Sequence, residues 1–307
     1  MTPHADLPDS EQQEKSRHRT LRAGQRSQVW IAGPDLPAPR LLFETDEILI
    51  EAPNWTLDGR HLLVNGDGAA WTLDIQHPER GLDRIVFEPP VSLNNDHVLS
   101  PDGEHLYLSA SDTHIYRGPL AGGPVTRLTP DDGKWHFLHG VSPDGRRLAY
   151  VQIDDFTRPG ALAILHPDHT VTVLDTGPGH LDGPEWSPDG RWIYFNTETF
   201  TTSTPGHAQI ARIPDGGGPL QRLTTSSTVD WFPHLSPDGR WASYISFPPG
   251  TTGHPADLPV EIRLVSADDW NQPVQSYALL GGQGSLNVNS WSPDSTHIAF
   301  MAYPIEP

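Results

Sequence analysis

The stretch EWSPDGRWIYF, from Glu185 to Phe195, recurs along the chain and decides its fold. The shared pattern is a large apolar residue, Ser or Thr, a Pro-Asp-Gly turn, two further residues and an apolar or aromatic run. The copies are NWTLDGRHLLV (54–64), VLSPDGEHLYL (98–108), GVSPDGRRLAY (140–150), EWSPDGRWIYF (185–195), HLSPDGRWASY (234–244) and SWSPDSTHIAF (290–300). Their turn aspartates are 42 to 56 residues apart. A repeat of this period is typical of propellers and solenoids.

Each copy predicts a tight hairpin. Pro fixes φ at the first central position, Asp suits the second, and Gly takes the left-handed conformation that closes the turn. The turn Asp is therefore interpreted as structural rather than catalytic. Leu57 replaces the Pro in the first copy, and Ser295 replaces the Gly in the last. We expect strain at Ser295, because a residue with a Cβ rarely adopts positive φ.

Further short strands lie between the copies. In the fourth unit they are AQIARI (208–213) and LQRLT (220–224), and in the second HIYRG (114–118) and VTRLT (125–129). Each unit is then a four-stranded meander of the size of one propeller blade. The prediction is an all-β fold, a six-bladed β-propeller of four-stranded antiparallel blades.

The two ends of the chain are expected to share the last blade. After Asp294 only 13 residues remain, which is enough for one more strand. The missing outer strands are available in QVWIAG (28–33) and RLLFET (40–45). Closing the ring in this way removes exposed sheet edges, which are an aggregation liability. We therefore expect a disordered tail over residues 1–24 and one propeller domain over residues 25–307.

Composition narrows the function classes. There are 39 acidic against 20 basic residues, a net charge of −19, which argues against nucleic-acid binding. The absence of Cys excludes thiolate metal sites and a thiol nucleophile. No apolar run is long enough to cross a bilayer, and residues 1–24 lack the apolar centre of a signal peptide. We expect a cytoplasmic protein with no membrane partner, and a monomer, as closed propellers commonly are.

The SPDG hairpin, followed by a strand of the form L/I-A-Y/F, resembles the repeat of TolB-type propellers, relatives of the WD-repeat fold. The resemblance covers residues 25–307. Segments such as NNDHVLSPDG (94–103), DWFPHLSPDG (230–239) and GGQGSLNVNSWSPD (281–294) are similar to a subgroup that consists of the propeller alone. The resemblance implies the fold without a defined reaction, since propellers host many activities.

Polar residues just upstream of the repeats are the candidate site. In this topology the inner strands begin together at one mouth of the central channel, so their side chains should converge there. Convergent polar groups and aromatic faces orient a ligand by hydrogen bonds and stacking. The candidate ligand-binding residues are Asn54, Asn95, Asp96, His97, His139, Asp182, Glu185, Asp230, Trp231, His234, His254, Gln283 and Asn287. The flanking Trp135 and Phe232 could stack on a sugar ring.

Three functions stay open. The first is a non-enzymatic propeller that binds a small carbohydrate-like ligand or a peptide at this mouth. The second is a metal-dependent carbohydrate-active enzyme of the oligosaccharide-lyase kind, in which His97, His139 and His234, with Glu185 or Gln283, hold one manganese, zinc or calcium ion. Oligogalacturonate lyases, propellers with a similar repeat whose His and Gln residues hold a manganese-type ion, are similar in kind. The third is a scaffold that binds a protein partner on its faces.

Overall fold

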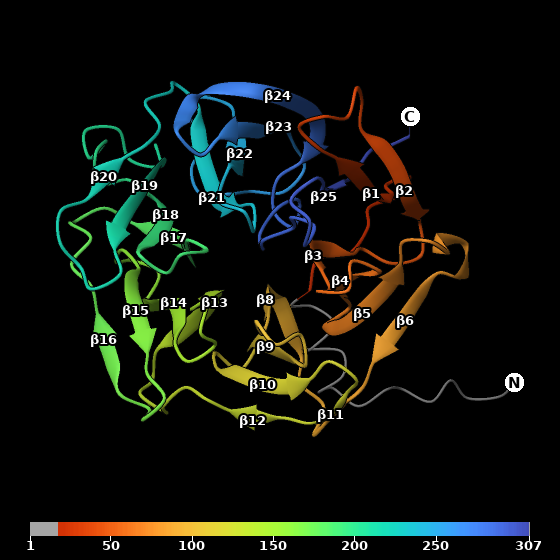
Figure 1. Cartoon of the computed structure of the whole chain (residues 1–307), viewed down its shortest axis with the longest axis horizontal. Coiled ribbons are helices and arrows are strands. Elements are labelled where there is room, and N and C mark those ends of the chain that lie inside the picture. Colours follow the sequence, from red (N-terminus) through yellow and green to blue (C-terminus); the bar gives the residue numbers. More distant parts are fainter. Residues whose placement is uncertain (1–17, 307) are drawn as a thin grey trace, which may run out of the picture.

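The computed structural model describes residues 18–306. They form six sheets arranged as blades around a central axis (Figure 1). Within these residues the only helical turn is η1 (Pro78–Arg80), and no helix is long and apolar enough to cross a membrane. The predicted all-β, six-bladed propeller is confirmed.

Five blades are four-stranded antiparallel sheets, and in each the strands run in chain order from the innermost outward. The first has β3 (Glu51–Trp55), β4 (His61–Gly66), β5 (Ala69–Asp74) and β6 (Leu82–Ile85). The second has β8 (Leu93–Leu99), β9 (His105–Ala110), β10 (Ile115–Pro119) and β12 (Thr126–Arg127). The third has β13 (Trp135–Val141), β14 (Leu148–Ile153), β15 (Ala161–Leu165) and β16 (Val171–Val173). The fourth has β17 (Leu181–Trp186), β18 (Trp192–Thr197), β19 (Gln209–Pro214) and β20 (Gln221–Arg222). The fifth has β21 (Val229–Leu235), β22 (Trp241–Phe247), β23 (Leu258–Ser266) and β24 (Asp269–Gly281). A parallel pair, β7 (Phe87–Glu88) with β11 (Gly123–Pro124), connects the first two blades.

The sixth blade is built from both ends of the chain, as predicted. Strand β25 (Ile298–Ala302) pairs with β1 (Ser27–Ala32), and β1 pairs with β2 (Arg40–Thr45). A bridge between Trp291 and Ile298 adds the segment before the last hairpin on the inner side. The ring is therefore closed by hydrogen bonds between its first and last strands.

Part of the expected N-terminal tail is packed against the ring, so the prediction of disorder is wrong for residues 18–24. The Nη1 of Arg19 lies 2.9 Å from the Oε1 of Glu51, and its guanidinium lies 4.6 Å from the centre of the Tyr303 ring. The buried carboxylates of Glu51 and Asp257 attract this cation and hold the segment in place. Residues 1–17 of the predicted tail lie outside the described residues.

The repeated hairpin owes its shape to one hydrogen-bond pattern. In each copy the hydroxyl of Ser or Thr donates to the turn Asp, whose Oδ1 also accepts from the backbone N–H two residues later. The Gly closes the turn at positive φ, 71° at Gly190 for example. Ser295 adopts φ 63°, so the strain expected there is present, and its Oγ accepts a bond from the N–H of Asp238. The turn Asp is thus structural.

Most inner strands carry a β-bulge near the middle, which the repeat pattern does not predict. In β3, β17 and β21 the residue before a Pro has positive φ: Ala52 at 55°, Gly183 at 63° and Phe232 at 52°. A bulge places two residues opposite one and changes which side chains face the channel. The residues on either side of it therefore no longer follow simple alternation.

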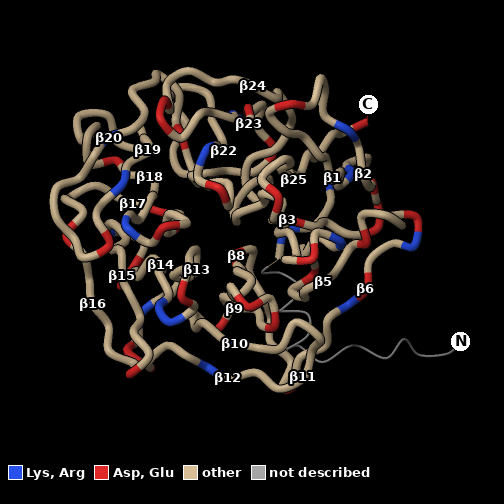
Figure 2. Tube along the Cα trace, viewed as in Figure 1, with Lys and Arg blue, Asp and Glu red and all other residues tan. Residues whose placement is uncertain are grey.

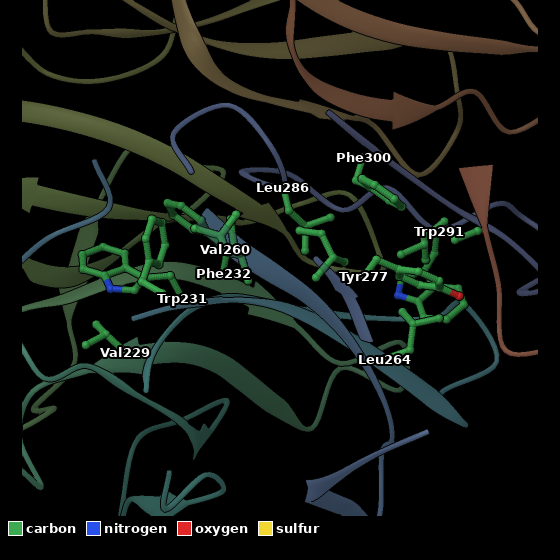
Figure 3. Packing of buried hydrophobic residues seen from close by; sticks show 14 of the residues in the cluster. Val229, Trp231, Phe232, Val260, Leu264, Tyr277, Leu286, Trp291 and Phe300 are labelled. Atoms are coloured by element: carbon green, nitrogen blue, oxygen red, sulfur yellow. The ribbon is translucent and has the colours of Figure 1, made fainter. Parts of the chain in front are cut away.

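Large apolar side chains pack between neighbouring blades. Figure 3 shows this for the cluster that joins the fifth and sixth blades, with Trp231 and Phe232 side by side at one end and Trp291 and Phe300 at the other. Burial of each such side chain stabilises the fold by about 1.5–3 kcal/mol. These contacts fix the inner strands whose side chains line the channel.

Candidate functional site

A cavity of about 480 Å³ lies where the inner strands begin. Eight of the predicted ligand-binding residues line it: Asn95, Asp96, His139, Asp182, Trp231, His254, Gln283 and Asn287. They come from inner strands and loops of five blades, which the ring brings together (Figure 1). We call this space the site cavity.

Another cavity, of about 360 Å³, lies at the other end of the inner strands, among the SPDG hairpins. Asn54, His97 and Glu185 line this cavity and not the first, whereas His139 borders both. The structure thus divides the predicted set between the two ends of the channel.

Two predicted residues line neither cavity. Asp230 is fully buried and accepts hydrogen bonds from the hydroxyls of Ser226, Thr228 and Ser246. His234 is held between blades: its Nδ1 lies 2.5 Å from the Oε2 of Glu185 and its Nε2 3.0 Å from the backbone oxygen of Leu286. Both residues have structural partners in place of a ligand.

Two carboxylates and two imidazoles form a charged cluster in the site cavity. The Nε2 of His139 lies 2.7 Å from one oxygen of Asp182, and the Nε2 of His254 lies 3.6 Å from the other. Asp96 is buried and receives a hydrogen bond from the side chain of Asn94. Figure 2 shows acidic residues (red) on several segments that face the centre of the ring.

Burial and charge shift the pKa values of this cluster in different directions. Burial lowers the pKa of His139, but the carboxylates of Asp182 and Asp96 outweigh it and raise that pKa to about 9. Burial raises the pKa of Asp96 to about 6, against the opposing effect of His139. Burial raises the pKa of Asp182 as well, but the imidazoles of His139 and His254 outweigh burial and hold this pKa well below its ordinary value. At neutral pH the cluster therefore contains an imidazolium paired with a carboxylate.

Aromatic rings lie directly beside the charged cluster, and Phe232 stacks on His139 with the ring centroids 5.8 Å apart. His254 packs against Trp231 and Phe232, with ring centroids 4.6 and 5.1 Å apart. Trp135 contacts Phe156 edge to face at 5.2 Å and stacks on Phe137 at 6.1 Å. These rings give the cavity apolar surfaces next to its charged cluster.

Five polar atoms on residues that line the cavity are buried and have no hydrogen-bond partner within residues 18–306. They are the Nδ2 of Asn95, the Nδ1 of His139, the Nε1 of Trp231, the Nδ1 of His254 and the Oε1 of Gln283. Buried polar groups in native proteins nearly always have a partner, and an unpaired one costs about 1–3 kcal/mol. This concentration of unpaired donors and acceptors in one cavity fits a site that a polar ligand fills.

Comparison with known proteins identifies the family. No family model matches the chain. An uncharacterised protein of Agrobacterium fabrum is 36% identical over 287 residues, covering 92% of this chain and 94% of that protein. A solved structure from Agrobacterium tumefaciens, provisionally named TolB, has 34% identity and a TM-score of 0.82 over 92% of this chain and 99% of its own. The chain belongs to the TolB-like β-propellers.

More distant structures share the fold alone. TolB from Acinetobacter baumannii has 18% identity and a TM-score of 0.58, over 86% of this propeller and 66% of that chain. An oligogalacturonate lyase in complex with manganese has 14% identity and a TM-score of 0.52, over 85% of this propeller and 75% of that chain. At these identities the likeness says nothing about the reaction of the TolB-like propeller.

The predicted metal ligands do not converge in this TolB-like propeller. His234 pairs with Glu185, His139 pairs with Asp182, and His97 faces the backbone oxygen of Ala52. Within residues 18–306, the one group of His, Asp and Glu whose ligand atoms all lie within 4.8 Å of one another is Asp102, Glu104 and His105, at a surface hairpin. The set His97, His139, His234 and Glu185 therefore does not form a single coordination sphere in this structure.

Some lining residues of the TolB-like propeller were missed by sequence reasoning. Phe137 lies two residues before His139 on β13, so simple alternation along the strand would have placed it in the site cavity. Phe156 lies in the loop DDFTRPG between β14 and β15, where no periodicity marks it. His180, directly before β17, was not missed: its position at the start of an inner strand predicts it at this mouth, and it lines the cavity.

Proposed function

We propose that this TolB-like propeller binds a small carbohydrate-like ligand in the site cavity. The observation that carries the proposal is the set of unpaired buried polar atoms beside aromatic faces, in a cavity of about 480 Å³. Small-ligand sites are commonly cavities of about 300–1,000 Å³ with apolar walls and a few convergent polar groups.

A polyhydroxylated ligand fits the mixture of unpaired groups. The Nδ2 of Asn95 and the Nε1 of Trp231 can only donate, whereas the Oε1 of Gln283 can only accept. A hydroxyl both donates and accepts, so several hydroxyls on one ring can satisfy all of them. The C–H face of the sugar would lie on Phe137 or Trp135, partly exposed aromatic rings of the cavity.

The test uses variants that remove an unpaired atom and retain the volume. In Asn95→Leu and Gln283→Met, we expect the melting temperature of the free protein to stay within about 2 °C of wild type or to rise, because a buried unpaired group is removed. Sugar affinity in the same variants should fall at least tenfold. Gln221→Met, on the outer strand β20, is the matched control and should change neither quantity.

The readout is thermal shift across neutral sugars and sugar acids, followed by calorimetry on any that bind. A saturable sugar whose affinity depends on Asn95 and Gln283 supports the proposal. If no sugar shifts the melting temperature, or if both variants bind like wild type, the proposal is wrong. The lyase and scaffold hypotheses stay predictions.

A further inference from the structure

A further cavity adjoins the site cavity on the same face of the ring. It measures about 490 Å³ and is lined by residues such as Pro178, Glu198 and Pro205. Ile153, Phe156 and His180 line both this cavity and the site cavity, so the two spaces meet at these side chains. We call the adjoining space the outer cavity and the three shared residues the junction.

The junction presents a hydrogen-bond donor of known position. The backbone N–H of Gly160 donates to the Nδ1 of His180 at 3.0 Å, so the neutral ring carries its proton on Nε2. No hydrogen bond from this Nε2 is formed within residues 18–306. His180 therefore offers an N–H to a molecule that crosses the junction.

The junction also presents an exposed aromatic surface. Phe156 is 68% exposed and Trp135, in edge contact with it, is 37% exposed. Phe156 lines both cavities, and Trp135 lines the site cavity next to it. Aromatic faces in these positions suit the C–H faces of successive sugar rings.

The charges nearby disfavour an anionic ligand. In the site cavity the His139 imidazolium offsets Asp182, which leaves the carboxylate of Asp96, and Glu198 lies in the outer cavity. Arg158 of the outer cavity lies 4.0 Å from both Asp154 and Asp155, which offset its charge. The chain as a whole carries −19, so the approach of a polyanion is opposed at long range as well.

From this geometry we propose that the ligand is a linear, neutral oligosaccharide that occupies both cavities and crosses the junction over Phe156 and His180. The proposal rests on the proposed function and extends it from a single sugar unit to a chain. The site cavity holds one end, the junction stacks on an inner ring, and the outer cavity holds the next unit.

The experiment is calorimetry with neutral oligosaccharide ladders, gluco-, xylo- and manno-oligosaccharides of one to six units. Affinity in at least one ladder should rise about tenfold between the single sugar and the chain that spans both cavities, and then level off. In Phe156→Ala and His180→Asn this gain should disappear. Because both side chains also border the site cavity, the affinity for the single sugar should fall as well, but by a smaller factor than the affinity for the chain. Asn retains the acceptor for Gly160 and removes the distal N–H.

Two matched variants control the interpretation. His180→Gln restores an N–H near the position of Nε2 and should retain most of the gain. Val173→Ala, at a side chain that is 53% exposed on the outer strand β16 of the same blade, should behave like wild type.

The outcomes separate this proposal from the proposed function. Equal affinity for all lengths, or tighter binding of oligouronates than of neutral chains, overturns the oligosaccharide proposal while the sugar site stands. A gain with length that survives in Phe156→Ala and His180→Asn also overturns it. If no sugar of any length binds, the proposed function has failed, and this proposal fails with it.

Discussion

Replacing His234 with Leu should destabilise the fold strongly, because His234 joins three blades at the channel. Its side chain is 1% exposed and bonds both to Glu185 of the fourth blade and to Leu286 in the sixth. Breaking a buried pair of this kind costs about 3–5 kcal/mol, since the remaining charge stays buried. The Oε1 of Glu185 keeps its bond from Asn289, so we expect the lower end, about 3 kcal/mol.

The assay is urea unfolding at pH 7, with the free energy of unfolding obtained by linear extrapolation. Arg240→Ala is the control: Arg240 forms a 2.6 Å pair with Asp238 but is 72% exposed, so its loss should be below about 0.5 kcal/mol. In a double-mutant cycle, Glu185→Gln should recover at least about 1 kcal/mol of the His234→Leu loss. A loss below about 1 kcal/mol in His234→Leu would show that the pair does not hold the blades together.

Two further predictions concern pH and the last hairpin. The folded-state pKa of His139 is about 9 and the unfolded value is about 6.5, so its stabilisation is complete below pH 6.5 and is lost as pH rises through 9. Between pH 6.5 and 9 the free energy of unfolding should therefore decrease in wild type, and this decrease should exceed that of His139→Gln by on the order of 3 kcal/mol. Equal decreases in the two proteins would contradict this. At the last hairpin, Ser295→Ala should cost about 1 kcal/mol, because the bond to Asp238 is lost and the positive φ remains. Ser295→Gly loses the same hydrogen bond, but Gly adopts positive φ without strain, so this variant should be about 1 kcal/mol more stable than the Ala variant in thermal unfolding. Equal stabilities of the two variants would show that the backbone at Ser295 is not strained.

The propeller could be predicted from the sequence because its hairpins are local. Each SPDG turn is stabilised by its own Ser and Asp side chains, so the six copies mark the blades without any long-range information. Closure followed from the number of residues left after Asp294 and is confirmed by the pairing of β1 with β25. Inner-strand starts such as Asp96, Asp182 and Trp231 were then placed at one mouth by topology alone.

Side-chain direction was harder to predict. Successive side chains of a strand point to opposite sides, so Asp230 faces away from the cavity that Trp231 lines. The bulge between Trp231 and His234 shifts the alternation again and directs His234 towards Glu185. The expected single metal site depended on His97, His139 and His234 meeting. His97 and His139 both border the cavity among the hairpins, but His234 lies between blades, where Glu185 and Leu286 bind its ring nitrogens.

The position of a bound sugar tests the central claim most directly. The measurement is a crystal structure of the protein soaked with the neutral oligosaccharide that gives the largest thermal shift. We predict a sugar ring in the site cavity, within hydrogen-bond distance of Asn95, Trp231 and Gln283, with the chain continuing past Phe156. A sugar bound on the outer strands, or a site cavity that stays free of sugar at saturating concentration, would contradict the account.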